Sequence, residues 1–152
     1  MRTIWSNGAL WLPVSIAIGV QLFKFIWEGI SRRNFDLSVL TRAGGMPSSH
    51  SAMTTSLATV LGYEQGLGSP LFAMATVLAI IVMYDARGVR QESGKHALLL
   101  NQIMRELFQG RPIGEQDLKE LLGHTGMEVA VGAVVGIVYA LLALESLAWL
   151  TK

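Results

Sequence analysis

The stretch Gly44-Gly45-Met46-Pro47-Ser48-Ser49-His50-Ser51 runs directly into an apolar segment of this 152-residue chain. Proline and serine before an apolar run are typical of a helix N-terminus, so we expect a helix from here to about Tyr63. Capping accounts for one serine, but it leaves His50 and the paired glycines, which let a backbone approach a ligand closely, unexplained. The unpaired N–H groups of a helix start favour anions such as phosphate. The stretch therefore predicts a phosphate site, with helix capping alone as the alternative.

Composition around this stretch indicates an all-α integral membrane bundle that forms one domain over residues 1–152. Hydrophobic residues make up 51% of the chain and charged residues 15%, which is too apolar for an ordinary soluble domain of this length. The Ser, Thr and Ala content of the second helix is typical of a helix packed inside a bundle. We expect about four spans, at 8–30, 47–63, 71–84 and 127–150. The helix of the third span is expected to continue unbroken beyond the membrane to Gly94 and on to Phe108. A short amphipathic helix is expected at 115–122.

Charge orients this bundle and limits its partners. The basic residues gather in the 31–46 connection and in the 87–123 region, whereas the 63–70 turn has none. With four spans these two regions share one face, predicted to be cytoplasmic, in a bacterial inner membrane or a plastid membrane. A net charge of +1 without a Lys/Arg-rich run gives no indication of a nucleic-acid partner. The chain has no cysteine and no visible metal-ligand cluster, so neither a metal nor another cofactor is expected.

A second histidine motif, Gly123-His124-Thr125-Gly126-Met127-Glu128, opens the last apolar segment. Thr125 and Glu128 fit the Ser/Thr-x-x-Glu capping box, which needs no chemistry. Alternatively, Glu128 lies one turn after His124 and accepts its imidazole N–H, which would orient a nucleophilic histidine. Spacing alone does not separate these two interpretations. The remaining histidine, His96, has no motif around it and is expected at the surface.

Several cations could bind the phosphate. Arg87, Arg90 and Asn101 follow one helical stripe, and Asp85 could hold an arginine in place, although arginines just past a span are often only topology signals. Lys24 lies near the end of the first span, where a lysine can simply extend to the membrane surface, but its stripe with Gln21 and Glu28 favours an inward role.

The Gly132-x-x-x-Gly136 pattern in the last helix permits close contact with another helix. That contact would lie within the bundle or across a homodimer, and the position within the bundle is favoured.

Together these motifs resemble the divergent branch of the type 2 phosphatidic acid phosphatase superfamily, which is related to vanadium haloperoxidases. The resemblance implies a helical bundle that works through a phosphohistidine intermediate. His124 would be the nucleophile, His50 the general acid, and Glu128 would replace an aspartate four residues after the nucleophile. The resemblance extends from about Gln21 to Gly136. It depends on Gly44–Ser51, on Tyr-Asp-Ala-Arg-Gly-Val-Arg at 84–90, and on Gly-His-Thr with Glu-Val at 123–129.

Besides the glutamate at position 128, the chain departs from the superfamily pattern at three further positions. Ser49 stands where the Pro-Ser-Gly-His motif has glycine, and Leu118 stands where an arginine usually precedes the nucleophile. The Lys-x6-Arg-Pro motif is absent, because Ser31 occupies the arginine's place after Lys24. The missing phosphate contacts are expected from Arg87 or Arg90.

The expected function is that of an enzyme, a membrane phosphatase acting on a lipid phosphate or an isoprenoid (di)phosphate. A histidine that titrates near pH ~6.5 can protonate the leaving oxygen and then deprotonate water, which suits His50. The alternative is a non-catalytic membrane protein that binds anionic lipid or a hydrophobic ligand, or a scaffold; a haloperoxidase is the weaker third interpretation. The expected phosphate-binding residues are Lys24, Ser48, Ser49, Arg87 and Arg90, supported by Asp85, Asn101, Gly44 and Gly45.

Overall fold

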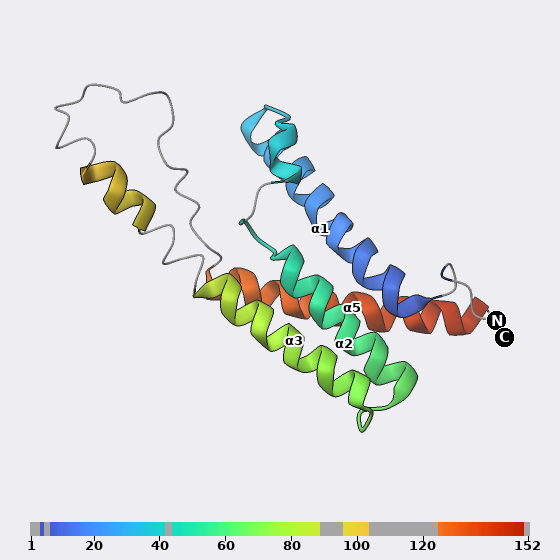
Figure 1. Cartoon of the computed structure of the whole chain (residues 1–152). Coiled ribbons are helices and arrows are strands. Elements are labelled where there is room, and N and C mark those ends of the chain that lie inside the picture. The colour runs from blue at the N-terminus through green and yellow to red at the C-terminus, as the bar shows by residue number, and fades with distance from the viewer. Residues whose placement is uncertain (1–3, 5–6, 42–43, 89–95, 104–124, 151–152) are drawn as a thin grey trace.

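The computed structural model describes residues 4, 7–41, 44–88, 96–103 and 125–150, and these residues form helices and connections without a strand. This confirms the all-α class. A separate helical segment covers 96–103. The other elements are α1 (Gly8–Arg32), the short 3-10 helix η2 (Leu37–Leu40), α2 (Ser49–Gln65), α3 (Pro70–Arg87) and α5 (Gly126–Leu150), as Figure 1 shows.

Helix α2 is the centre of the bundle. It packs against α1, α3 and α5, and these three helices have few contacts with one another. Its buried positions carry small or weakly polar side chains, so the neighbouring backbones can approach closely. The composition of this segment had indicated an interior helix, and the packing agrees with that. The buried residues are Ser51, Ala52, Thr55, Ser56, Ala58, Val60 and Gly62.

Three helices are long and apolar enough to cross a membrane: Gly8–Arg32, Pro70–Arg87 and Gly126–Trp149. Large apolar side chains such as Trp27, Ile80 and Leu142 are exposed on these helices, as expected of surfaces that face lipid. The sequence predicted about four spans. In the structure α2 has 17 residues and a more polar composition, and it lies among the three apolar helices.

The third helix is shorter than the sequence predicted. Helix α3 ends at Arg87, and the N–H of Gly88 donates to the carbonyl oxygen of Tyr84 at 2.9 Å. The prediction of one unbroken helix from Leu71 to Phe108 is therefore wrong at Gly88. Glycine loses more conformational entropy in a helix than any other residue, which makes it a favourable place for a helix to stop. The predicted amphipathic piece at 115–122 lies outside the described residues.

Helix α5 contacts α2 through the two glycines of the Gly-x-x-x-Gly pattern. A Cβ atom added at Gly132 would lie 2.5 Å from the carbonyl oxygen of Ser48. One added at Gly136 would collide with the Ala52 carbonyl oxygen and the Thr55 hydroxyl. Only glycine permits such an approach. The predicted close contact within the bundle is thus present, between α5 and the first half of α2.

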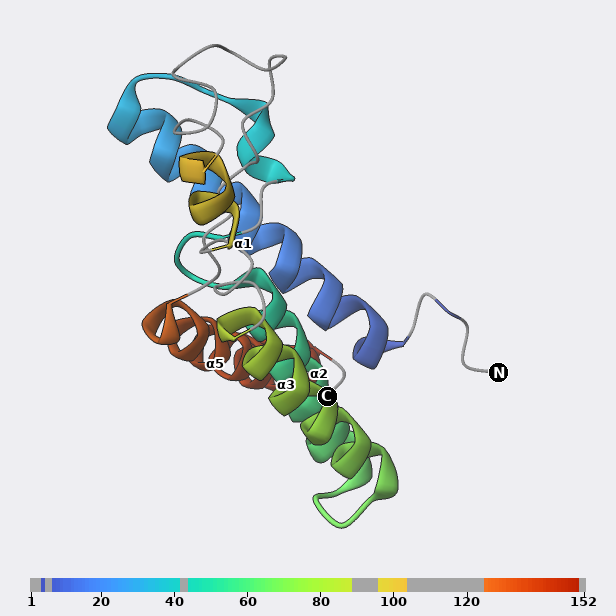
Figure 2. The same cartoon turned by 60° about the vertical axis from the view of Figure 1, so that its left-hand side comes forward.

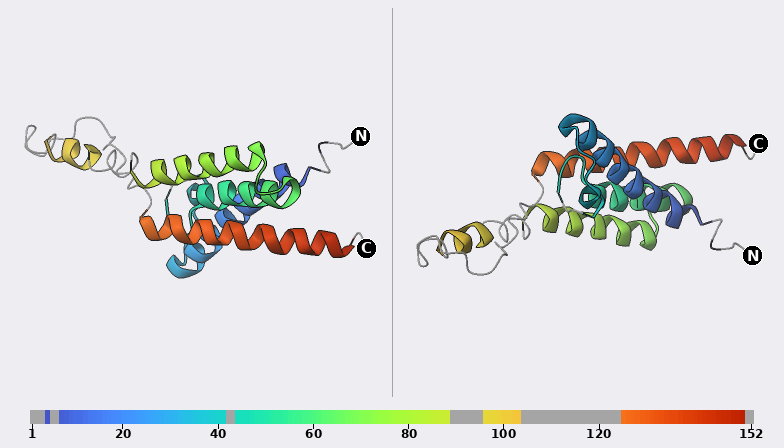
Figure 3. Two further views of the ribbon diagram at one scale, coloured as in Figure 1. Left: turned by 90° about the horizontal axis from the view of Figure 1, so that it is seen from below. Right: turned by 90° about the horizontal axis from the view of Figure 1, so that it is seen from above.

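The helix order brings three chain segments to one end of the bundle. Both views of Figure 3 place the start of α2, the end of α3 and the start of α5 together, with the start of α1 and the end of α5 at the opposite end. In Figures 1 and 2 the last turns of α1 and η2 extend beyond the start of α2. The two motif-bearing helix starts therefore share one end, as the topology predicted.

Candidate functional site

The loop that leads into α2 is attached to α1 by a buried lysine. Lys24 is only 8% exposed, and its Nζ donates a hydrogen bond of 3.0 Å to the carbonyl oxygen of Gly44. Gly44 and Gly45 have φ values of +106° and +79°, in the left-handed region that favours glycine. The paired glycines thus let the backbone turn so that a carbonyl meets Lys24. Lys24 points inward to the loop and not out to the membrane surface.

Ser48 connects the two histidine motifs. It is fully buried at the N-cap of α2, where its Oγ accepts a hydrogen bond of 3.4 Å from the N–H of Ser51. Its own N–H donates to the main-chain carbonyl oxygen of Glu128 at 3.1 Å. This bond joins residues 80 positions apart and sets the start of α2 beside the first turn of α5. Capping is therefore real, but it accounts for only part of what this serine does.

The first turn of α5 carries the predicted capping box. The N–H of Thr125 donates to Glu128 Oε2 at 3.1 Å, and the N–H of Glu128 donates to Thr125 Oγ1 at 3.3 Å. The capping interpretation of this motif is thus confirmed. The interpretation that Glu128 orients a nucleophilic His124 stays a prediction, because His124 lies outside the described residues. A carboxylate accepts more than one hydrogen bond, so the two interpretations are compatible.

A polar pocket of about 330 Å³ adjoins the glycine loop. Arg32 lies in its wall and pairs with Glu28 at 2.9 Å. Arg32 is not among the residues predicted from the sequence, although this arginine comes directly after the position where the superfamily motif has arginine. Its spacing of four and eight residues from Glu28 and Lys24 was the available signal, because those positions share a helix face. The lining residues are Lys24, Trp27, Glu28, Ser31, Arg32, Val39, Gly44, Gly45 and Met46.

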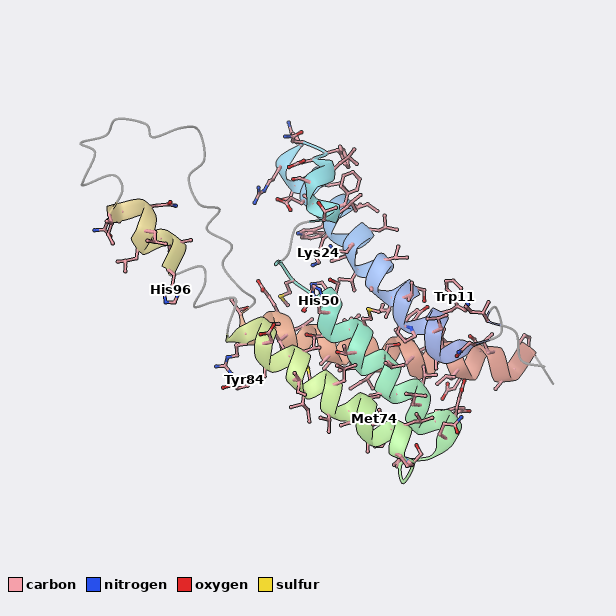
Figure 4. The ribbon with its side chains drawn as sticks, in the orientation of Figure 1. Trp11, Lys24, His50, Met74, Tyr84 and His96 are labelled. Carbon is pink, nitrogen blue, oxygen red and sulfur yellow. The ribbon has the colours of Figure 1, made fainter. Side chains whose placement is uncertain are left out.

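His50 and Ser49 line a second pocket of about 410 Å³, between α1 and the start of α2. Figure 4 shows His50 at the head of α2, with Lys24 on the neighbouring part of α1. The Gln21 amide nitrogen donates to the Leu40 carbonyl oxygen at 2.9 Å, and its Oε1 is buried without a partner among the described residues. The remaining walls are apolar: Ala17, Ile18, Leu22, Leu40 and Met53.

The other predicted phosphate ligands lie elsewhere. Arg87 is exposed, and its guanidinium lies next to the α5 start, since a Cβ added at Gly126 would be 3.6 Å from its Cζ. Asp85 is also exposed, and in the described part of the chain no ion pair joins it to Arg87. Arg90, like His124, falls outside the described residues.

The two remaining residues with predicted positions lie on the 96–103 segment. Asn101 is buried there, 5% exposed. His96 is exposed on the same segment, apart from His50 in Figure 4, which agrees with its predicted surface position. Within the described ranges no group of three or more His, Asp or Glu side chains is placed to hold a metal ion.

Comparison with known proteins places these motifs in a family. The Divergent PAP2 family matches residues 5–139. A Bacillus subtilis (strain 168) protein described as the uncharacterized membrane protein YuiD is 37% identical over 147 residues, which cover 90% of this chain and 93% of that relative. No solved structure matches the chain. The chain therefore belongs to the Divergent PAP2 family, and it is an integral membrane protein.

Proposed function

We propose that this member of the Divergent PAP2 family is a membrane phosphatase that hydrolyses a lipid phosphate or an isoprenoid (di)phosphate. The observation that carries the proposal is the hydrogen bond from the Ser48 N–H to the Glu128 carbonyl oxygen. This bond holds the buried N-cap Ser48, which precedes the exposed His50, beside the first turn of α5, which follows His124. Two helix N-termini at one point favour a bound phosphate group.

The reaction has two steps. An imidazole nitrogen of His124 attacks phosphorus, the ester P–O bond breaks, and His50 gives a proton to the leaving oxygen. His50 then takes a proton from water, which attacks the phosphohistidine, breaks its P–N bond and releases inorganic phosphate. Glu128 orients the His124 ring and stabilises the imidazolium that forms. The net reaction of a monophosphate consumes one water and yields an alcohol and phosphate. With a diphosphate the anhydride P–O bond breaks in place of the ester bond, and the products are the monophosphate and phosphate.

The cations close to this helix start neutralise the phosphoryl oxygens as charge shifts in the transition state. Lys24 is held against Gly44, and Arg32 lies in the same pocket. Ser48, Ser49 and the first N–H groups of α2 face the same end of the bundle. Arg87 approaches from the α5 side, next to Gly126. With the basic residues at this end, we place the site at the cytoplasmic face.

The second candidate is a non-catalytic membrane protein that binds anionic lipid. The capping box favours it, because Thr125 and Glu128 are satisfied by each other without any chemistry. The absence of an arginine at position 118, where Leu118 stands, also favours it. Binding alone, however, needs only cations and gives no use to two histidines at helix starts.

The test is release of inorganic phosphate by the detergent-purified protein from a panel of lipid and isoprenoid phosphates. We expect release by the wild type and by His96→Ala, which removes the histidine outside the site, and a loss of roughly 10²-fold or more for His124→Ala and His50→Ala. Equal release by wild type and His124→Ala would remove the mechanism. A wild type that binds these lipids and releases nothing would establish the non-catalytic candidate instead.

A further inference from the structure

The polar and apolar pockets beside the α2 start follow each other along α1. The polar one is lined by α1 residues from Lys24 to Arg32, and the apolar one by those from Ala17 to Leu22. Adjacent η2 residues, Val39 and Leu40, line the first and the second pocket respectively. Going back along α1 from Lys24 to Leu22 and Ile18, the adjoining surface therefore changes from charged to apolar within about one helical turn.

His50 lies where this change occurs. It lines the apolar pocket, and the loop before it lines the polar one. A leaving oxygen that takes its proton from His50 would thus have hydrocarbon walls directly beyond it. The polar group at this boundary is Gln21, whose buried Oε1 lacks a donor among the described residues. The O–H of the alcohol product can supply that donor.

The apolar pocket is open to the side. Its rim residues Ile18, Leu22 and Met53 are 55%, 46% and 39% exposed, and the first two lie on α1, which is long and apolar enough to cross a membrane. A hydrocarbon chain can therefore enter from the lipid without crossing water. A hydrocarbon chain brings no polar group of its own into this pocket, whereas a glycerol ester linkage would bring acceptors that meet mainly Ala17, Ile18 and Leu40.

A larger apolar pocket, of about 480 Å³, lies among α2, α3 and α5. Its walls include Phe72, Ile80 and Leu141, and among its described lining residues there is no cation and no histidine. It does not adjoin Lys24 or Arg32. It serves as an internal comparison, because it is apolar and accessible and shares no lining residue with the polar pocket beside Lys24.

We propose that the pocket between α1 and α2 binds the hydrocarbon chain of a single-chain alkyl or prenyl phosphate, with its phosphate toward Lys24 and its ester oxygen at His50. This inference depends on the proposed function for the identity of the site, and it adds the substrate class and the path of the chain. It excludes a diacylglycerol phosphate as the preferred substrate.

Photolabelling in nanodiscs tests this placement without requiring turnover. The probe is a non-hydrolysable prenyl phosphonate with a diazirine near the phosphonate. We expect crosslinks in the segments around Ile18 and Met53, and competition by prenyl phosphate roughly tenfold or more stronger than by phosphatidic acid. Crosslinks in α3 and α5, or equal competition by the two lipids, would overturn the proposal.

Substitutions that fill the pocket distinguish binding inside it from nonspecific labelling anywhere on the lipid-facing surface. We expect Ile18→Trp to reduce labelling roughly tenfold or more, and Ile80→Trp, in the larger apolar pocket, to leave it unchanged. Because a tryptophan variant can fail to fold, Met53→Ala is the second variant, with a smaller reduction from lost contacts. Labelling that neither variant reduces would contradict the proposal. Labelling as expected without phosphate release would refute only the proposed function.

Discussion

The starts of α2 and α5 are both capped helix N-termini, but different parts of the chain hold them. The N-cap of α2, Ser48, is buried, and contacts from α1 and α5 fix this helix start: Lys24 binds Gly44, and Glu128 accepts from Ser48. The α5 start is exposed at Thr125 and is capped by a residue only three positions later. The bundle thus combines one helix start that depends on contacts from distant parts of the chain with one that forms locally.

Gly136→Ala tests the α2–α5 contact most severely. Its new Cβ would collide with the Ala52 carbonyl oxygen, a backbone atom that cannot rotate away. We expect a loss of about 3 kcal/mol in unfolding free energy, because the two helix backbones would have to move apart to make room for the new methyl group. Thermal unfolding in detergent measures it. Gly19→Ala on α1, with nothing within 4 Å of the new Cβ, is the matched control and should unfold at or slightly above the wild-type temperature.

Glu128→Gln separates local capping from chemistry. Glutamine can keep the capping box, so the unfolding temperature should stay near that of the wild type. The charge that stabilises an imidazolium is lost, and we expect phosphate release to fall roughly 10²-fold or more. The measurement is kcat alongside thermal unfolding. Unchanged kcat would show that Glu128 acts only as a cap.

Lys24→Met tests whether the α2 start depends on α1. The substitution leaves the Gly44 carbonyl oxygen without this donor while preserving most of the side-chain volume. We expect unfolding free energy to fall by about 1–3 kcal/mol, as for an unsatisfied buried group. Lys24→Arg should recover part of that loss, because it keeps a cation. A Met variant as stable as the wild type would mean that this contact does not hold the loop.

Gly45→Ala should have the smallest effect. Its Cβ would meet only the Lys24 side chain, at 3.5 Å, but φ is +79°, which costs an alanine about 1–2 kcal/mol. Gly68→Ala is the control, in the loop between α2 and α3, where no atom lies within 4 Å of the new Cβ. Equal unfolding temperatures for the two variants would contradict a strained turn at Gly45.

What could be predicted from the sequence was mostly local. The Ser48 cap and the Thr125–Glu128 box were readable because their partners lie three residues apart. The end of α3 at Gly88 was missed, since the apolar pattern continues beyond it and one glycine is a weak signal. Arg32 could not be predicted from the motif pattern, because it lies one residue after the motif position and only its helix face relates it to Lys24.

By itself the sequence determined the helices apart from the end of α3, their apolar surfaces, the small-residue interior of α2 and the cap at each motif. All of these follow from composition and from spacings of a few residues, which backbone geometry converts directly into contacts. Only the tertiary structure decided that Lys24 binds Gly44, that Ser48 binds Glu128, and that Arg32 shares a pocket with the glycine loop. The first two contacts join segments 20 and 80 residues apart. The Ser48–Glu128 contact forms because close packing of α5 on α2 through Gly132 and Gly136 brings those helix starts together, and the Lys24–Gly44 contact forms because α1 also packs against α2.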